Sequence, residues 1–581
     1  MSDLNSFGAE EEFWVKQLGS EDKRYLIFKV PLPEDFPDEE KETLYHLSKA
    51  VEAINPIYVN QIFPELPEFY NFLDSLKENA NEDEVRKIEN YQKSLLMHNK
   101  FFPGSNGKSV VLDIEDERLQ EITPQEFLED YNFFKPYLEG RMEYDGRGNF
   151  YPEGLEEEDL EEIDGAKDLN TRVIKTEDGY KALRNEGLFK DWINKMIIPH
   201  LRRASEATGD EKLSEYLRYK IKELETGEKE DRLEAHRKWL EIDSENEGKI
   251  DFILGLSDEV YMDRVAAKKG TAEGLVFIRN EKENEKFRRI RELLPEIEER
   301  NTYSDEFKKS PEDLKISSDL VAYDVLRWSG DCIDDGTLIG KSWPDEGNLG
   351  RKQMLLNNMF QFYPLKNILS LTMNEEEFES IEDKIDEAFK IYVNLHELGH
   401  STGRDDIEYK GISEYYSTLE EARASLVAMN SIPLLKERGI VEDDEALYKV
   451  MLGKTIQRLS YEPVEDHIKE ENLLFHWFGE RGCIERGDGL KFKVDVEKTK
   501  ENMGELLKLV GDILFNCDKE GAKNLIENYV YEDEIKDELQ KKLKSTPRGR
   551  GFLFPRINED GTIDYPKNLE EQNLPIISFS S

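Results

Sequence analysis

Residues 375–405, EEEFESIEDKIDEAFKIYVNLHELGHSTGRD, carry the pattern that decides most about this chain. Apolar side chains recur here at steps of three and four residues, as from Phe378 to Ile385, which predicts one face of an α-helix. His396 and His400 continue the same stripe, and side chains four residues apart are neighbours on a helix. The stretch therefore predicts an amphipathic helix that turns two imidazoles to one side.

The two histidines and the glutamate between them form the HExxH pattern of zinc hydrolases. His396 and His400 can bind one ion, while Glu397 lies beside the open metal position as the general base. A chance pair of hydrogen-bonded core histidines is the alternative. Since the chain holds only 8 histidines and these two lie on a periodic helix, the sequence favours the metal site.

A third protein ligand is expected from a second helix, because a catalytic zinc ion usually has three protein ligands and one water. Residues 415–430, YYSTLEEARASLVAMN, predict a largely buried helix that carries Glu420 and Glu421. Adjacent acids in an apolar helix are costly unless a cation compensates them, and bound zinc would do so. One of them would bind the metal and the other would orient a histidine, but the spacing does not decide which.

Short runs upstream of these helices favour a sheet. Residues 249–256 and 272–280 are rich in branched apolar side chains and short enough for strands. Residues 170–248 instead carry apolar side chains every three or four positions in a background of Glu and Lys, which predicts solvated helices. A second helix-rich block is expected over residues 375–544, so the metal-binding helices lie in a mainly helical part of the chain.

Charge and cysteine content limit the expected partners and location. The chain has 80 Lys and Arg residues against 128 Asp and Glu residues, and its net charge of −48 repels phosphate backbones and anionic lipids. Nucleic acid and membranes are therefore not expected as partners, whereas the free amino terminus of a peptide suits this charge; solubility alone is the simpler explanation. The three cysteines, Cys332, Cys483 and Cys517, are too scattered for a disulfide framework. With no secretory signal and no membrane-spanning run, a cytoplasmic location is expected.

The helix pair resembles the metal-binding helices of the dipeptidyl peptidase III family of zinc peptidases. The second signature of that family, EExRA, is matched by Glu420, Glu421, Arg423 and Ala424. The resemblance implies that Glu421 is the third ligand of one zinc ion per chain and that Glu420 orients a histidine from behind the metal. Many relatives have a six-residue HExxxH, whereas this chain has the five-residue HELGH of ordinary zinc peptidases, and Ser425 stands where the family often has an acid.

Two further segments resemble the family outside the metal helices. Residues 258–278, DEVYMDRVAAKKGTAEGLVFI, resemble its E-x-Y segment, which implies that Tyr261 stabilises the tetrahedral intermediate. The same resemblance places Glu259 and Glu273 near the amino terminus of the substrate. The segment EDHIKEENLLFHWFGERG resembles the stretch with a substrate-contacting histidine, here His467.

The N-x-P-N substrate-binding motif of the family is matched less closely. In residues 327–348, RWSGDCIDDGTLIGKSWPDEGN, Ser342 and Asp345 replace its two asparagines. Both positions are expected to contact the substrate, but the replacement leaves open how many residues are removed at each cut. Two residues also keep an ordinary alternative: Tyr261 as a half-buried strand tyrosine and His467 as a surface ion-pair partner of the acids beside it.

The resemblance spans roughly residues 145–575 and implies an α+β fold with two lobes separated by a cleft. The length of 581 residues also exceeds what one core holds. A mainly helical lobe would carry the zinc site, and a mixed α/β lobe would carry the strands. The expected divisions are an irregular α+β region that contributes to the substrate lobe (1–140), helices and strands with the E-x-Y stretch (141–330), the helical catalytic lobe (331–545) and a tail packed on the surface (546–581).

The function implied by the resemblance is that of a zinc-dependent exopeptidase that releases dipeptides from the amino end of oligopeptides. Glu397 would activate the attacking water, and Tyr261 with His467 would stabilise the oxyanion. A zinc aminopeptidase or oligopeptidase of a different register is the second hypothesis. A peptide-binding protein that keeps the fold without turnover is the third. A monomer is expected, with oligopeptides as its partners.

Overall fold

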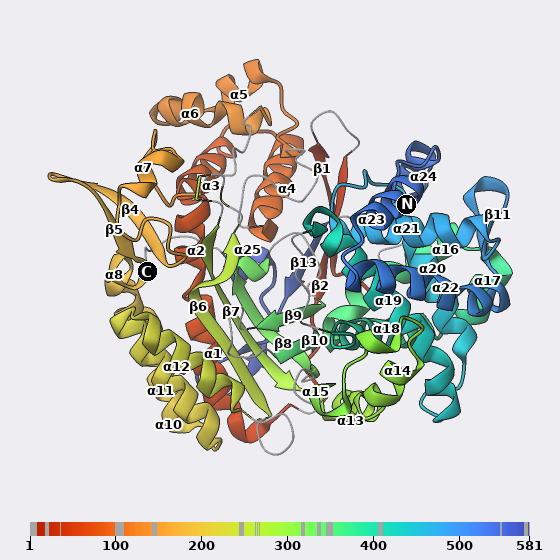
Figure 1. The fold of residues 1–581 in the computed structure, drawn as a ribbon. Coiled ribbons are helices and arrows are strands. Elements are labelled where there is room, and N and C mark those ends of the chain that lie inside the picture. Colours follow the sequence, from red (N-terminus) through yellow and green to blue (C-terminus); the bar gives the residue numbers. More distant parts are fainter. Residues whose placement is uncertain are drawn as a thin grey trace.

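Two hydrophobic cores organise the chain in the computed structural model (Figure 1). The first core draws on residues 13–362 and 552–569, and the second on residues 287–543. Helices and sheets surround the first core and mainly helices surround the second, so the predicted α+β class is confirmed. The structure describes residues 8–17, 22–34, 36–98, 110–141, 148–242, 249–261, 263, 265–266, 268–314, 320–333, 339–343, 352–404, 411–546, 549–573 and 579.

A five-stranded sheet connects the two cores, with the strand order β6-β7-β8-β10-β9. Its strands are β6 (Ile250–Tyr261), β7 (Lys269–Arg279), β8 (Leu320–Gly330), β9 (Gly340–Trp343) and β10 (Lys352–Leu356). Neighbouring strands are antiparallel except β8 and β10, which run parallel. Along β8, Val321 belongs to the first core and its neighbours Leu320 and Ala322 to the second, because successive side chains of a strand point to opposite faces. The strands predicted at 249–256 and 272–280 are confirmed as parts of β6 and β7.

Helices cover the sheet on the side of the first core. Helices α1 (Lys41–Glu52) and α2 (Asn55–Ile62) pack on β7 and β8. Helix α1 also contacts α10 (Ile198–Ala207), which stacks on α11 (Glu211–Thr226) and then α12 (Lys229–Leu240) at the edge of the molecule in Figure 1. These helices confirm the amphipathic pattern over the second half of residues 170–248.

The prediction of helices is wrong at the start of that stretch. Strands β4 (Thr171–Thr176) and β5 (Gly179–Arg184) form an antiparallel hairpin there. Thr171 and Val173 are buried while Arg172 between them is only partly so, which is the two-residue alternation of a strand. Gly179 opens β5 with a φ of 120°, a conformation that favours glycine and suits the tight turn.

A four-stranded sheet joins the two ends of the chain, with the order β13-β2-β1-β3. Its strands are β1 (Glu11–Gln17), β2 (Lys23–Lys29), β3 (Val110–Val111) and β13 (Gly549–Leu553). Figure 1 shows the blue β13 beside the red β2, with which it pairs in parallel. The sequence predicts a surface tail from residue 546, whereas β13 pairs with β2, and Phe552 and Phe554 lie in the first core.

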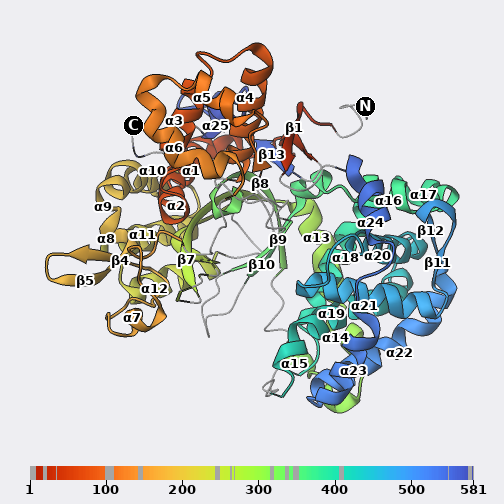
Figure 2. The same cartoon turned by 90° about the horizontal axis from the view of Figure 1, so that it is seen from above.

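Long helices build the second core (Figure 2). They are α18 (Ile385–His400), α19 (Ser413–Glu437), α20 (Asp444–Arg458), α21 (Asp466–Glu480) and α22 (Val496–Phe515). Helix α19 contacts the other four and is buried on nearly all sides, which confirms the buried helix predicted over 415–430. The helix pattern over 375–400 is interrupted, because α17 (Glu375–Ile381) ends before α18 begins. Within the described part of the chain, no helix combines the length and apolar composition needed to cross a bilayer.

Candidate metal centre

The last turn of α18 carries His396 and His400, and α19 brings Glu421 to them. Gly399 lies between the two histidines, where α18 and α19 come close together. A Cβ atom at this position would lie 2.8 Å from the carbonyl oxygen of Ala424 and 2.9 Å from its Cα atom. Only glycine permits this approach, so the helix contact depends on one residue of the HELGH stretch.

Three potential ligand atoms converge between these helices. His396 Nε2 lies 3.1 Å from Glu421 Oε2 and 3.2 Å from His400 Nε2. His400 Nε2 lies 3.6 Å from the same carboxylate oxygen. Each side chain offers one atom, and the three atoms lie within 4.8 Å of one another. The fold therefore brings together the three residues predicted as metal ligands.

The spacing of these atoms is within about 0.2 Å of that expected around a tetrahedral zinc ion. Zinc binds imidazole nitrogen and carboxylate oxygen at about 2.0–2.2 Å, which places two ligands of a tetrahedron about 3.3–3.6 Å apart. The three separations here are 3.2, 3.1 and 3.6 Å. Two imidazole nitrogens facing each other at 3.2 Å also need a proton or a cation between them. Two nitrogens and one carboxylate oxygen are the donor set of many catalytic zinc sites.

Glu420 and Arg423 hold His400 from the other side of its ring. Glu420 Oε1 lies 3.1 Å from His400 Nδ1, and Arg423 donates to the two oxygens of Glu420 at 2.8 and 2.5 Å. Burial alone would raise the pKa of Glu420, but Arg423 and His400 lower it to about 2, so the carboxylate stays charged. Because Glu420 accepts at Nδ1, the other ring nitrogen of His400, Nε2, points to the other two ligand atoms.

The two acids make this cluster attractive to a cation. Burial would lower the pKa of His400, but Glu420 and Glu421 raise it to about 10. Burial lowers the pKa of His396. In the metal-free chain His400 therefore holds a proton near neutral pH, and a metal ion competes with that proton for the same nitrogen.

Two residues with predicted catalytic roles border the cluster. Glu397 is half-buried on α18, close enough for its charge to act on His396. His467 lies in the first turn of α21, with its Nδ1 3.4 Å from Glu421 Oε2 and its side chain 53% exposed. Glu465 is the N-cap of α21, and its side chain accepts from the backbone N–H groups of His467 and the residue that follows it. The carboxylate that the His467 ring contacts is thus that of the predicted ligand Glu421.

Glu273, expected near the amino terminus of a substrate, lies on β7 of the five-stranded sheet. Its side chain is buried, with 1% of the residue exposed. Glu273 Oε2 accepts from Lys341 Nζ at 2.9 Å and from Cys332 Sγ at 3.2 Å. This glutamate therefore already has a cationic partner within the protein.

The other predicted substrate residues are placed by their backbone or not at all. In the β6–β7 ladder Tyr261 lies opposite Lys269. The side chains of Glu259, Tyr261 and Ser342, and all of Asp345, lie outside the described residues. Their roles stay predictions.

A buried ionic cluster that was not predicted from the sequence lies behind His396. Lys454 on α20 pairs with Glu471 on α21, and Arg458 lies 3.2 Å from Glu471. Glu470, the preceding residue, is 1% exposed. A signal was present, because these two adjacent acids lie in an apolar helix just as the predicted metal ligand on α19 does.

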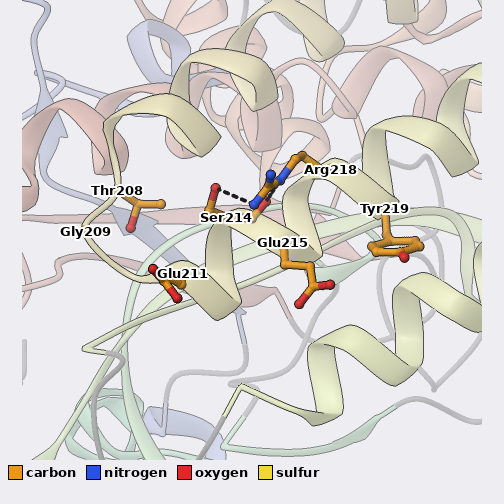
Figure 3. Close-up of a pocket in the computed structure, with 7 residues that line it drawn as sticks. All are labelled: Thr208, Gly209, Glu211, Ser214, Glu215, Arg218 and Tyr219. Atoms are coloured by element: carbon orange, nitrogen blue, oxygen red, sulfur yellow. Dashed lines mark hydrogen bonds between the residues drawn. The ribbon is translucent and has the colours of Figure 1, made fainter.

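A surface depression at the start of α11 is separate from this cluster (Figure 3). It has a volume of about 610 Å³ and is lined by side chains between Thr208 and Tyr219. Arg218 in this depression turns back to Ser214 of its own helix. None of the metal-ligand residues lines it, so it has no part in the site.

A glutamate on one helix facing an HExxH pair on another, within a mixed α+β fold, is typical of metallopeptidases. Comparison with known proteins narrows this class to one family. Residues 164–408 match the sequence profile of peptidase family M49. The predicted family and the predicted class of peptidase are confirmed for this central region. The match includes the HELGH stretch and ends before α19.

Two solved structures share the fold. Dipeptidyl peptidase III from Caldithrix abyssi superposes with a TM-score of 0.76 and 18% identity, covering 90% of this chain and 97% of that one. The enzyme of the same name from Corallococcus sp. strain EGB gives a TM-score of 0.66 and 18% identity, covering 90% and 94%. Nudix hydrolase 3 of Arabidopsis thaliana is 22% identical over 367 residues, 59% of this chain. The chain spans about half the length of this curated relative, of which the alignment covers 46%.

Proposed function

We propose that this protein is a zinc-dependent peptidase that releases dipeptides from the amino end of oligopeptides. The observation that carries the proposal is the convergence of His396, His400 and Glu421, whose ligand atoms lie within 4.8 Å of one another. These three side chains would hold one zinc ion per chain. The M49 match supports a peptide substrate, and the fold shared with two dipeptidyl peptidases III supports the dipeptidyl register.

A zinc ion held here would polarise the scissile carbonyl and lower the pKa of a bound water towards about 7. Glu397, half-buried beside His396, would take the proton of the attacking water and deliver it to the leaving amine. His467, at the border of the cluster, would donate a hydrogen bond to the developing oxyanion, and Tyr261 would do the same from β6. Glu259, also on β6, would bind the ammonium group of the substrate, which fixes the distance from the amino end to the cut.

A second candidate is a zinc aminopeptidase or oligopeptidase of a different register, that is, one that cuts at another distance from the amino end of the peptide. The ion pair of Glu273 with Lys341 favours it, because a glutamate that already binds a lysine at 2.9 Å is a poor site for a second ammonium group. Ser342 and Asp345, which replace two asparagines of the family motif, favour the same candidate. Both candidates use the same metal-binding residues and the same general base.

The cytoplasmic location and the monomeric state belong to the same proposal. The low cysteine content, 3 in 581 residues, supports a reducing compartment. Light scattering coupled to size-exclusion chromatography tests the monomer, for which a mass near 68 kDa is expected from the 67.9 kDa chain.

Mass spectrometry on a ladder of oligopeptides tests the function. We expect the zinc-loaded protein to release dipeptides, and Glu397→Gln to lower kcat by roughly 10²–10⁴-fold while its zinc content stays unchanged. Release of single residues or internal cuts would favour the second candidate. Peptide binding without cleavage, equal in the wild type and Glu397→Gln, would point to a binding protein without turnover.

A further inference from the structure

A buried polar network lies behind His396, on the side of its ring away from Glu421. His396 Nδ1 is 3.1 Å from Ser425 Oγ, which is also 2.9 Å from the hydroxyl of Tyr392. Ser425 is 1% exposed and Tyr392 is 4% exposed. The Ser425 hydroxyl is thus shared between the predicted ligand histidine and a second buried side chain.

The direction of each hydrogen bond follows from what each group can donate. A histidine that binds a metal through Nε2 carries its proton on Nδ1, so His396 donates to Ser425 Oγ. The hydroxyl of Tyr392 can donate to the same oxygen or accept from it. In the arrangement in which Tyr392 donates, Ser425 accepts twice and its own O–H is directed to another acceptor.

Glu470 on α21 is the candidate acceptor for the Ser425 hydroxyl. Glu470 is 1% exposed, and the Ser425 hydroxyl is among the groups that act on its carboxyl. Among the described residues, Glu470 Oε1 has no hydrogen-bond partner. A buried carboxyl oxygen without a donor is costly, and the Ser425 hydroxyl is a group beside Glu470 that can donate.

Burial and the neighbouring Glu471 raise the pKa of Glu470 to about 8, although the charge of Lys454 acts in the opposite direction. Lys454 pairs with Glu471, and Lys454 Nζ lies 4.8 Å from the centre of the Tyr392 ring. Arg458 pairs with Glu471 as well, at 3.2 Å. Both cations thus pair with Glu471, and Glu470 keeps an oxygen that can accept a hydrogen bond whether or not it carries a proton.

We propose that Ser425 and Glu470 are positioning residues for His396: Ser425 Oγ accepts a hydrogen bond from His396 Nδ1–H, and Glu470 accepts one from the Ser425 hydroxyl. Each ligand histidine would then have an acid behind its Nδ1: Glu420 directly for His400, and Glu470 through Ser425 for His396. This inference rests on the proposed zinc site. It gives neither residue a part in the chemical step.

Zinc affinity of the full-length protein, measured by competition with a chelator of known affinity, tests the proposal. Glu470→Leu removes the acceptor and Glu470→Gln keeps an uncharged one, so we expect a loss of about 10–100-fold for Leu and a smaller loss for Gln. Ser425→Ala breaks the link, and the double variant Ser425→Ala/Glu470→Leu is expected to bind no more weakly than Ser425→Ala. Glu377→Leu and Glu377→Gln are matched controls, since Glu377 is a buried acid on α17 that accepts from Val494 N; they are expected to leave zinc affinity unchanged.

Two further readouts separate positioning from loss of the fold. Thermal unfolding shows which metal-free variants fold, and the visible spectrum of the cobalt-substituted protein reports ligand geometry. We expect that spectrum to change in the Ser425 and Glu470 variants and not in the Glu377 variants.

Wild-type zinc affinity in a folded Glu470→Leu protein would overturn the proposal, and so would additive losses in the double variant. If Glu470→Leu does not fold, an unchanged cobalt spectrum and affinity in Glu470→Gln and Ser425→Ala overturn it. A wild-type protein that binds no zinc would remove the proposed function itself. A zinc-binding wild type with unaffected variants would remove this inference alone.

Discussion

At the scale of single residues, the protonation of His400 determines how metal binding depends on pH. Its burial opposes a positive charge, yet Glu420 and Glu421 raise its pKa to about 10 in the metal-free chain. A metal ion needs the neutral imidazole and must displace this proton. The two acids that attract the metal therefore also make its binding depend on pH.

Zinc binding is expected to release about one proton between pH 7 and 9, with affinity rising roughly tenfold per pH unit. The stability of the metal-free protein follows the opposite trend. Because the folded pKa of His400 lies above its ordinary 6.5, its contribution to stability is full below about pH 6.5 and is lost as pH rises through about 10. Calorimetry in two buffers of different ionisation enthalpy counts the protons, and an affinity independent of pH from 7 to 9 would contradict the assignment.

Lys341 determines whether Glu273 can bind the ammonium group of a substrate, because it already donates to Glu273. Two like charges about 4 Å apart repel by about 4 kcal/mol at an effective dielectric constant near 20, so an ammonium group at Glu273 must displace Lys341. Lys341→Met is expected to raise the preference for free over N-acetylated peptides about tenfold, a change of about 1.4 kcal/mol. Lys341→Arg keeps the charge and serves as the control. The ratio of kcat/KM values measures the preference, and an unchanged ratio in Lys341→Met would show that Glu273 does not meet the substrate.

At the scale of elements, the metal cluster depends on how closely α18 and α19 approach. Gly399 faces the backbone of Ala424, where an added methyl group would meet atoms at 2.8 and 2.9 Å. Since backbone atoms cannot move as a side chain does, the added group must push the helices apart. That movement separates the two histidines on α18 from Glu421 on α19.

Gly399→Ala is expected to lower the free energy of unfolding by roughly 1–3 kcal/mol and to weaken zinc binding. Gly479→Ala is a matched control, because Gly479 is also helical, on α21, and has no atom within 4 Å of an added Cβ. The control is expected to keep zinc affinity and to gain up to about 1 kcal/mol from helix propensity. Denaturant unfolding and zinc titration of both variants check this, and equal zinc affinity in the two would contradict the role of the close approach.

The sequence predicted those elements whose pattern is local. The apolar stripe that ends in His396 and His400 marks α18, and the adjacent acids mark α19. These patterns predict two histidine ligands and one of two acids, and the family resemblance then selects Glu421. Strand β13 could not be, because it pairs with β2, more than 500 residues away, and no local pattern encodes that partner. The ion pair of Glu273 with Lys341 was missed for the same reason, since it joins two strands that are not neighbours in the sheet.

At the scale of the whole molecule, the residues of the proposed reaction belong to two cores. The metal-binding residues lie on helices of the second core, and the E-x-Y segment lies on strands that pack in the first. Strand β8 contributes side chains to both cores and so connects them. A peptide that contacts both groups of residues must extend from one core to the other. The predicted cleft would hold the peptide in that position.

Anomalous X-ray scattering at the zinc edge, from crystals of the zinc-loaded full-length protein, tests the central claim most directly. The claim is that side chains from α18 and α19 hold one catalytic ion. We expect a single peak about 2.0–2.2 Å from His396 Nε2, His400 Nε2 and a carboxylate oxygen of Glu421. A peak at another place, or one bound by Glu420 instead of Glu421, would contradict it.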